Sequence, residues 1–156
     1  MIDYEAHRHA VEQVVPNMFE AMAQDLPQTN LAASNQCEML TKGLYIALTN
    51  QGFDIKREYH EDNDGIFHYV INHQPETEAP REEDVITDLN PWQFMTDHLP
   101  SKVTHTYLHG TRQEVMERLE KEGAPDYFIA LRGLATVTKA HTFVTKDNKS
   151  RTLYVA

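Results

Sequence analysis

The chain contains the three residue types of a thiol-dependent catalytic site, in an order that would allow them to act together. Its single cysteine, Cys37, follows Ser34, a suitable N-cap that predicts the start of a helix. A cysteine in the first turn of a helix lies near unpaired backbone N–H groups and the positive end of the helix dipole, which favour a thiolate. His68 then lies in one strand-like run and Asp88 in the next. This order predicts a cysteine nucleophile with a histidine base and an orienting acid.

Each of these residues would have its own role in the reaction. The thiolate of Cys37 would attack a carbonyl carbon, and His68 would take the thiol proton and later return it to the leaving group. Asp88 would hold the imidazole in one tautomer and stabilise its cation. The backbone N–H of Cys37 would donate to the developing oxyanion, and Asn35 or Gln36 would supply a second donor. The site predicted in this way uses no metal and no cofactor.

The predicted site requires a particular pairing of two strands. Residues 66–72 and 85–89 can pair as an antiparallel hairpin across the polar loop between them. Counting back from the loop places Asp88 opposite residue 69, or opposite His68 if the register shifts by one. Only the second register places both side chains on one face, at Cβ atoms about 5 Å apart. Asn90 shares the strand face of Asp88 and is the alternative partner of His68. We favour Asp88, because the proline after Asn90 indicates that the strand ends there.

The elements that would position these residues change from helices to strands along the chain. Apolar spacing predicts helices over residues 4–15, 16–23 and 34–50, with Pro16 beginning the second and Gly52 stopping the third. Alternation predicts strands over residues 53–59, 66–72, 85–89, 103–108, 136–144 and 151–155, and the capping box Thr111-Arg112-Gln113-Glu114 predicts a further helix. Helices followed mainly by strands favour an α+β fold, with N-terminal helices packed on an antiparallel sheet.

The three segments around Cys37, His68 and Asp88 resemble those of a known family. The helix start Asn35-Gln36-Cys37, the run Phe67-His68-Tyr69-Val70-Ile71 and the run Val85-Ile86-Thr87-Asp88-Leu89 are similar to papain-fold bacterial toxin and effector domains. Many of these domains are protein-glutamine deamidases, and transglutaminases share their core. The similarity covers about residues 30–95 of a single domain of residues 1–156. It implies a papain-like fold and hydrolysis of a glutamine side-chain amide on a protein substrate, through a thioester on Cys37.

The chain also departs from this family at several positions. It lacks a papain-type Cys-Gly-Ser-Cys-Trp segment, and Leu31 stands where papain relatives have the glutamine of the oxyanion hole. The segment Asn90-Pro91-Trp92 is similar to the Asn-x-Trp of papain-like proteases, which makes Asn90 a competing candidate for the third member, although we favour Asp88. Because water or an amine could accept the acyl group from the thioester, cysteine protease and transglutaminase activities stay as alternatives to deamidation.

Composition limits the classes of partner. Fourteen basic and 24 acidic residues give a net charge of −10, which disfavours nucleic acid or an anionic membrane as partner and suits a basic protein target. The acidic runs Glu58–Asp64 and Glu76–Asp84 are predicted to be solvated loops. The nine histidines show no His-Glu-x-x-His spacing, and no glycine-rich phosphate loop is present, so we expect neither a metal nor a nucleotide.

The sequence shows no sign of export or of membrane insertion. A single cysteine excludes an intrachain disulfide, Met1–Glu5 resembles no signal peptide, and no apolar run approaches the roughly 20 residues that span a bilayer. We expect a cytoplasmic protein, or one delivered into a target cell by a secretion system that uses no signal peptide. The competing hypothesis is a non-enzymatic acidic binding or inhibitor protein. The sequence leaves the oligomeric state open.

Overall fold

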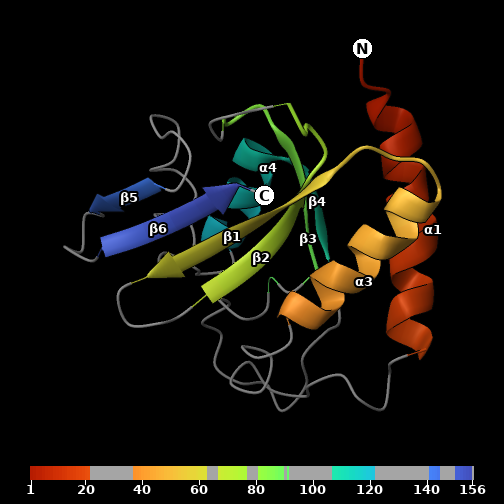
Figure 1. Cartoon of the computed structure of the whole chain (residues 1–156), viewed down its shortest axis with the longest axis horizontal. Helices are drawn as coiled ribbons and strands as arrows, with labels where there is room; N and C mark the ends of the chain where they lie inside the picture. Colours follow the sequence, from red (N-terminus) through yellow and green to blue (C-terminus); the bar gives the residue numbers. More distant parts are fainter. Residues whose placement is uncertain are drawn as a thin grey trace.

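The chain folds as an α+β structure, as the order of its predicted elements indicates. A computed structural model describes residues 1–21, 37–62, 67–76, 81–89, 91, 107–121, 141–144 and 150–155. Within these ranges it contains three helices and one sheet of six strands (Figure 1). The prediction of helices packed on an antiparallel sheet is therefore confirmed at the level of fold class.

Every neighbouring pair of strands in the sheet is antiparallel. The helices are α1 (Tyr4–Ala21), α3 (Cys37–Asn50) and α4 (Arg112–Lys121). The strands are β1 (Lys56–Asp62), β2 (Phe67–Asn72), β3 (Val85–Asp88), β4 (Leu108–Thr111), β5 (His141–Val144) and β6 (Ser150–Val155). The strand order is β4-β3-β2-β1-β6-β5, so β2 lies between β1 and β3 near the middle of the sheet.

The two faces of the sheet are covered by different helices. On the α1/α3 face, Ile71 of β2 packs in one core with Leu44 of α3 and Val11 of α1. On the α4 face, Glu58 of β1 and Asn72 of β2 belong to a polar cluster with α4. Because side chains alternate along a strand, odd-numbered β2 residues face α3 and even-numbered ones face α4. In Figure 1, α3 lies beside α1 at the near side of the sheet and α4 lies beyond the strands.

Most of the apolar burial among the described residues lies on the α1/α3 face. The fully or largely buried members of this core are Ala10, Val11, Val15, Phe19, Leu40, Leu44, Leu48, Ile55, Ile71 and Leu89. The helical members recur at three- and four-residue spacing, which is the pattern of an amphipathic helix covering a sheet. This core holds α3, and therefore Cys37 at its first residue, against β2.

Three predicted element boundaries are wrong. The strand predicted over residues 53–59 is β1 at Lys56–Asp62, three residues later. Helix α1 continues through Pro16 to Ala21, although Pro16 was expected to begin a second helix. Pro16 is exposed, as is Glu12, whose carbonyl would have accepted the missing N–H, while Val15 and Phe19 continue the buried face beyond the proline. The strand predicted over residues 103–108 is replaced, in its described part, by β4 at Leu108–Thr111.

The end of α3 agrees with its prediction. Gly52 has a φ of 91°, and its N–H donates to the carbonyl of Thr49. A positive φ is easily adopted by glycine, which explains why the helix stops here. In the described part of the chain, none of the helices is both long and apolar enough to cross a bilayer.

Candidate functional site

His68 and Asp88 lie in contact on the α4 face of the sheet. The Nε2 atom of His68 is 3.0 Å from Oδ1 of Asp88, and the two side chains have relative exposures of 1% and 0%. A carboxylate at this distance accepts a hydrogen bond from Nε2–H and therefore selects one imidazole tautomer. In the predicted site, the other ring nitrogen, Nδ1, is the atom that would exchange a proton with the nucleophile.

The strand pairing behind this contact differs from both registers considered from the sequence. Ile71 pairs with Thr87 and Asn72 with Ile86, and continuing the register by one pair places Asp88 beside Val70. Asp88 is therefore a diagonal neighbour of His68 on the same face, rather than the residue directly opposite. Diagonal neighbours are separated by about 7–8 Å between backbones, a gap that an imidazole and a carboxylate can bridge. The hairpin was predicted correctly, but its register was wrong.

Cys37 is the first residue of α3, as the helix-start pattern predicts for the backbone. Its side chain lies outside the part of the chain that the structure describes, as do Asn35, Gln36 and Asn90. Helix α3 packs on the α1/α3 face, whereas His68 and Asp88 project from the α4 face. The structure thus joins two members of the predicted site and places the helix of the third on the opposite face.

The start of α3 nevertheless lies near the end of the sheet at which β2 begins, where His68 is located. The hydroxyl of Thr41, one helical turn after Cys37, donates to the carbonyl of Tyr69 at 3.4 Å. Tyr69 immediately follows His68, and Figure 1 shows α3 and β2 beginning at the same end of the sheet. A route from Cys37 to the imidazole of His68 would therefore pass around this end.

Comparisons with protein-family models, with curated proteins and with solved structures give no match to the chain. In the described residues, no group of three or more histidine, cysteine or acidic side chains is arranged to hold a metal ion.

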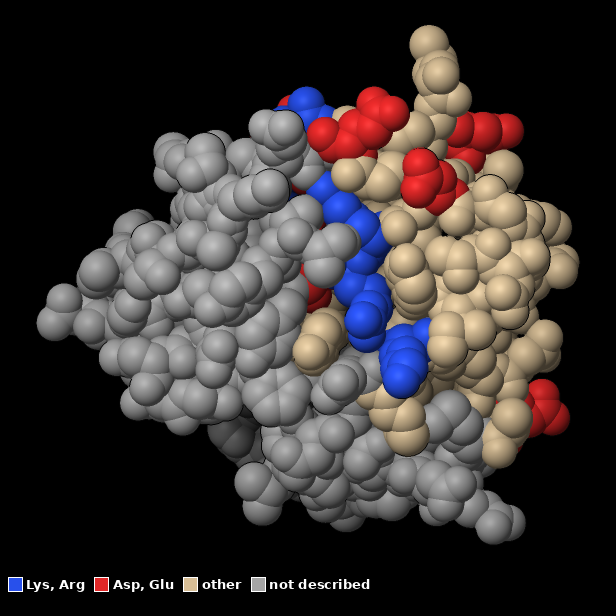
Figure 2. All heavy atoms as spheres, in the orientation of Figure 1, with Lys and Arg blue, Asp and Glu red and all other residues tan. Residues whose placement is uncertain are grey.

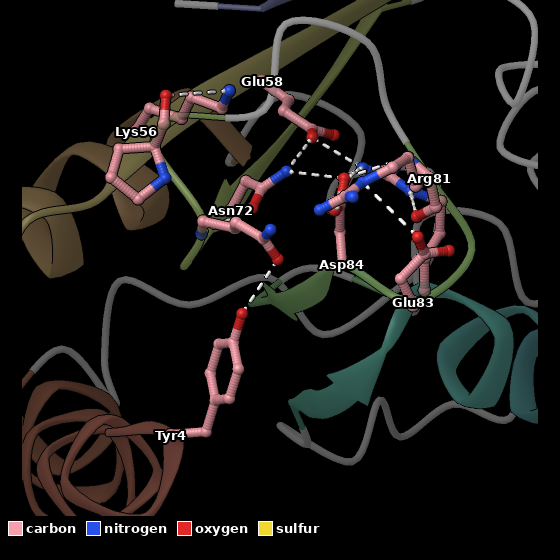
Figure 3. Close-up of polar contacts among 10 residues, drawn as sticks. Tyr4, Lys56, Glu58, Asn72, Arg81, Glu83 and Asp84 are labelled. Atoms are coloured by element: carbon pink, nitrogen blue, oxygen red, sulfur yellow. Dashed lines mark hydrogen bonds and ion pairs between the residues drawn. The ribbon is translucent and has the colours of Figure 1, made fainter. Parts of the chain in front are cut away.

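Sequence reasoning missed a cluster of buried charges on the α4 face. Arg112 Nη2 is 2.6 Å from Glu58 Oε1 and 3.6 Å from Asp84 Oδ2. The side-chain amide of Asn72 donates to the same two carboxylates at 2.6 and 3.2 Å. Figure 3 shows Glu58, Asn72 and Asp84 pointing toward one another, with Arg81 also beside Asp84. We call Glu58, Asn72, Asp84 and Arg112 the ion cluster.

The ion cluster corrects the prediction that both acidic runs are solvated loops. Glu58 and Asp84 come from these runs, yet both side chains are fully buried. The backbone of Arg112 also donates to the carbonyl of Asp84 at 2.7 Å, and its Nε donates to the carbonyl of Arg81. The cluster therefore ties α4 to β1 and to the connection between β2 and β3. No local pattern in the sequence marks which acidic residue will meet an arginine more than 25 positions away.

A second polar group, also missed, lies on the α1/α3 face. His7 Nδ1 is 2.9 Å from His73 Nδ1, His73 Nε2 is 2.7 Å from Thr87 Oγ1, and Thr87 Oγ1 is 2.7 Å from His109 Nδ1. We call these four side chains the histidine chain. Its only signal in the sequence is that His7 lies on the apolar face of the first helix. His73 falls in a segment predicted as a polar loop.

The imidazoles of the histidine chain are biased toward their neutral forms. Burial lowers the pKa of His73 well below its usual value, and His109 and His7 lower it further. Burial, followed by the charge of Arg8 and by His7, lowers the pKa of His109 to about 4, although Glu114 opposes the change. Burial also lowers the pKa of His7. Charged imidazoles are disfavoured here because they would lose water without gaining, among the described residues, a carboxylate at hydrogen-bonding distance.

Proposed function

We propose that this chain is a thiol-dependent amide hydrolase of papain-like type, in which Cys37, His68 and Asp88 act together on a protein glutamine side chain. The observation that supports it is the 3.0 Å contact between His68 and Asp88, two residues 20 positions apart that are buried on the same face of the sheet. An imidazole oriented by a carboxylate is the arrangement that general acid–base catalysis requires. Cys37 at the first residue of α3 supplies the nucleophile.

The proposed reaction has two stages. His68 Nδ1 takes the proton of the Cys37 thiol, and the sulfur bonds to the carbonyl carbon of the amide. The carbon–nitrogen bond then breaks, His68 returns the proton to the departing nitrogen, and ammonia leaves behind a thioester. Water next attacks the thioester with the help of His68, which yields glutamate and restores the thiol. Asp88 keeps Nε2–H in place through both stages.

This mechanism requires Cys37 and His68 to meet, although α3 and the side chain of His68 lie on opposite faces of the sheet. The sulfur of Cys37 must come within hydrogen-bonding reach of His68, around the end of the sheet where α3 and β2 begin. The proposed substrate is a protein, and its glutamine side chain would have to reach this end of the sheet, because the face between α3 and β2 is filled by the apolar core. Figure 2 shows a line of lysine and arginine atoms across the middle of one face, while acidic atoms gather toward the end that carries the N-terminus. A basic target would approach that acidic end.

The thiol itself provides the first test. Iodoacetamide alkylation of Cys37, followed across pH 5 to 9, should proceed well below neutral pH if His68 stabilises the thiolate as an ion pair. The His68→Ala variant should then lose at least about tenfold in alkylation rate at the acid end. His9→Ala is the matched control, because His9 is an exposed histidine on α1. An identical pH profile in wild type and His68→Ala would contradict the proposed pair.

The second test addresses the reaction. Candidate target proteins are incubated with wild type or Cys37→Ala and then analysed by mass spectrometry. A gain of about one dalton at a glutamine, present only with wild type, is the expected result, because deamidation replaces NH₂ by OH. Peptide cleavage that depends on Cys37 would instead indicate a protease, and crosslinks to lysine would indicate a transglutaminase.

A non-enzymatic binding protein is the second candidate, and burial favours it. His68 and Asp88 are closed off from solvent, and α3 lies on the opposite face, as expected of a pair that only stabilises the sheet. Such a protein would use its acidic surface to hold a basic partner. A Cys37 that resists alkylation at every pH, together with target proteins unchanged in mass, would favour this candidate over the hydrolase.

A further inference from the structure

The histidine chain connects the N-terminal helix to three parts of the sheet. His7 belongs to α1, His73 directly follows β2, Thr87 belongs to β3 and His109 belongs to β4. The three hydrogen bonds that join them measure 2.9, 2.7 and 2.7 Å. The ring of His7 also contacts those of Phe53 and His73 edge to face, with centroids 4.8 and 5.0 Å apart. His7 is therefore the point at which this polar chain holds α1.

The hydrogen bonds of the chain can all form while every imidazole is neutral. If His7 donates from Nδ1, His73 accepts at Nδ1 and donates from Nε2 to Thr87, whose hydroxyl donates to His109. If the direction is reversed, His109 donates to Thr87, Thr87 to His73, and His73 to His7. Either arrangement places one hydrogen in each contact. Protonation of any of these imidazoles would therefore add positive charge without completing a missing hydrogen bond.

The surroundings of the chain do little to balance such a charge. The groups that act on it are Asp3, at the start of α1, Arg8 of α1, Asp54, which precedes β1, and Glu114 of α4. The two aspartates favour a charged His7, and Glu114 favours a charged His109, but burial outweighs them in both cases. Arg8 and the neighbouring imidazoles add repulsion. Since His73 is fully buried, its charge would have no access to water.

We propose that the histidine chain is an acid-sensitive latch, which holds α1 against the sheet at neutral pH and releases it when the imidazoles gain protons. Helix α1 packs on the sheet and takes no part in its strand pairing, so it can leave without disrupting the backbone hydrogen bonds between strands. Among the described residues, α1 also contacts the segment after β2 through the hydrogen bond that the Tyr4 hydroxyl donates to the side chain of Gln74, at 2.8 Å. Release would expose the apolar face of α1 that carries Val11, Val15 and Phe19.

The direction of the pH effect follows from linkage. A histidine free in water has a pKa of about 6.5, whereas that of His109 in the folded chain is about 4. The released state therefore binds protons more tightly than the docked state. The free energy that holds α1 on the sheet is therefore greatest above about pH 6.5, and it falls as the pH is lowered from there toward about 4. Each histidine that gains a proton on release raises the release equilibrium by up to tenfold per pH unit.

Hydrogen exchange with mass spectrometry tests the latch on the full chain. Amide protection in residues 4–21 is compared with that in residues 112–121 between pH 7.5 and 4.5, after correction for the intrinsic pH dependence of exchange. We expect protection of α1 to fall by at least tenfold across this range, while that of α4 changes little. Parallel losses in both helices would overturn the proposal, because they would indicate general unfolding rather than release of α1.

Neutral replacements connect the effect to the histidine chain. In His7→Asn and His109→Asn, the side-chain amide can place a nitrogen or oxygen near the former Nδ1 without taking up a proton near neutral pH. In both variants, the protection of α1 should depend less steeply on pH. Each variant should lower the slope of log protection against pH by up to one, because one fewer proton is taken up on release. His109→Asn is informative even if His7→Asn fails to fold, since residue 109 lies outside α1. His9→Asn, on the exposed side of α1, should keep the wild-type slope. An unchanged slope in His109→Asn would overturn the latch.

Discussion

The two faces of the sheet both bury polar side chains, but they satisfy them by different means. On the α4 face, the ion cluster joins Arg112 to two carboxylates, and His68 contacts Asp88. On the α1/α3 face, three imidazoles and one hydroxyl are joined by hydrogen bonds that can all form while the imidazoles are neutral, and burial lowers the pKa of each imidazole. The α4 face therefore depends on paired charges, and the α1/α3 face depends on the absence of charge.

This difference predicts which changes will destabilise each face of the sheet. A buried charge that loses its partner retains the full cost of its desolvation, so a single substitution on the α4 face should be severe. A neutral donor or acceptor that loses its partner costs less, because only a hydrogen bond must be replaced. Acid should act first on the α1/α3 face, since its imidazoles are held below their usual pKa values.

The largest effect is expected from Arg112→Met, which leaves Glu58 and Asp84 buried without the guanidinium. We expect a loss of about 3–5 kcal/mol in the free energy of unfolding, measured by urea denaturation at pH 7. Lys121→Met, at the exposed end of the same helix, should change it by less than about 0.5 kcal/mol. A loss below about 1 kcal/mol in Arg112→Met would show that the charges of the α4 face do not depend on each other.

A double variant tests whether Glu58 and Arg112 form an energetic pair. Replacing Glu58 by Gln in the Arg112→Met background removes one of the stranded carboxylates, and should recover part of the loss because less charge stays buried. If the two substitutions instead add independently, Glu58 and Arg112 would not form an energetic pair despite their 2.6 Å contact.

A smaller effect is expected from Thr87→Val, which keeps the shape of the side chain but removes the hydroxyl between His73 and His109. Both imidazole nitrogens lose a partner inside the protein, and we expect a loss of about 1–3 kcal/mol at pH 7.5 by the same measurement. Thr49→Val is the control, because the Thr49 hydroxyl bonds to carbonyls within its own helix. Equal losses in the two variants would mean that the histidine chain contributes no special stability.

The smallest effect concerns Gly110, on the α4 face of β4. A methyl group there would lie 2.5 Å from Oε2 of Glu114, which now accepts a hydrogen bond from the N–H of Thr111 at 2.9 Å. The flexible carboxylate can move aside at the cost of that bond, so Gly110→Ala should lose about 1 kcal/mol. The thermal midpoint measures this change. Glu114→Ala should remove most of the penalty of a subsequent Gly110→Ala, and full additivity would contradict this explanation.

The elements that the sequence predicted well depend on contacts between near neighbours. The capping box is confirmed, because the N–H of Glu114 donates to Thr111 Oγ1 at 3.1 Å and the Glu114 carboxylate accepts from the N–H of Thr111. Gly52 ends α3 through its positive φ, which also depends on a few adjacent residues. The strands over residues 66–72 and 85–89 were predicted within one residue of their observed ends, because alternation is itself a local pattern.

The features that sequence reasoning missed depend on distant residues. The register of β2 against β3 was wrong by at least one pair, since a polar loop of twelve residues does not determine which residues pair. Pro16 was expected to separate two helices, but the buried face of α1 outweighs the lost hydrogen bond. Glu58 and Asp84 were read as solvated because their partner, Arg112, follows them by 54 and 28 positions.

By itself, the amino-acid sequence determined the fold class, the end of α3, the start of α4, and the residue types available for chemistry. Only the tertiary structure decided which of these residues meet: His68 with Asp88, Arg112 with its two carboxylates, and three histidines in a neutral chain. The physical reason is that local structure follows from interactions over three or four residues, whereas the register and the choice of covered face follow from packing of the whole sheet. That packing places the helix of Cys37 and the His68–Asp88 pair on opposite faces.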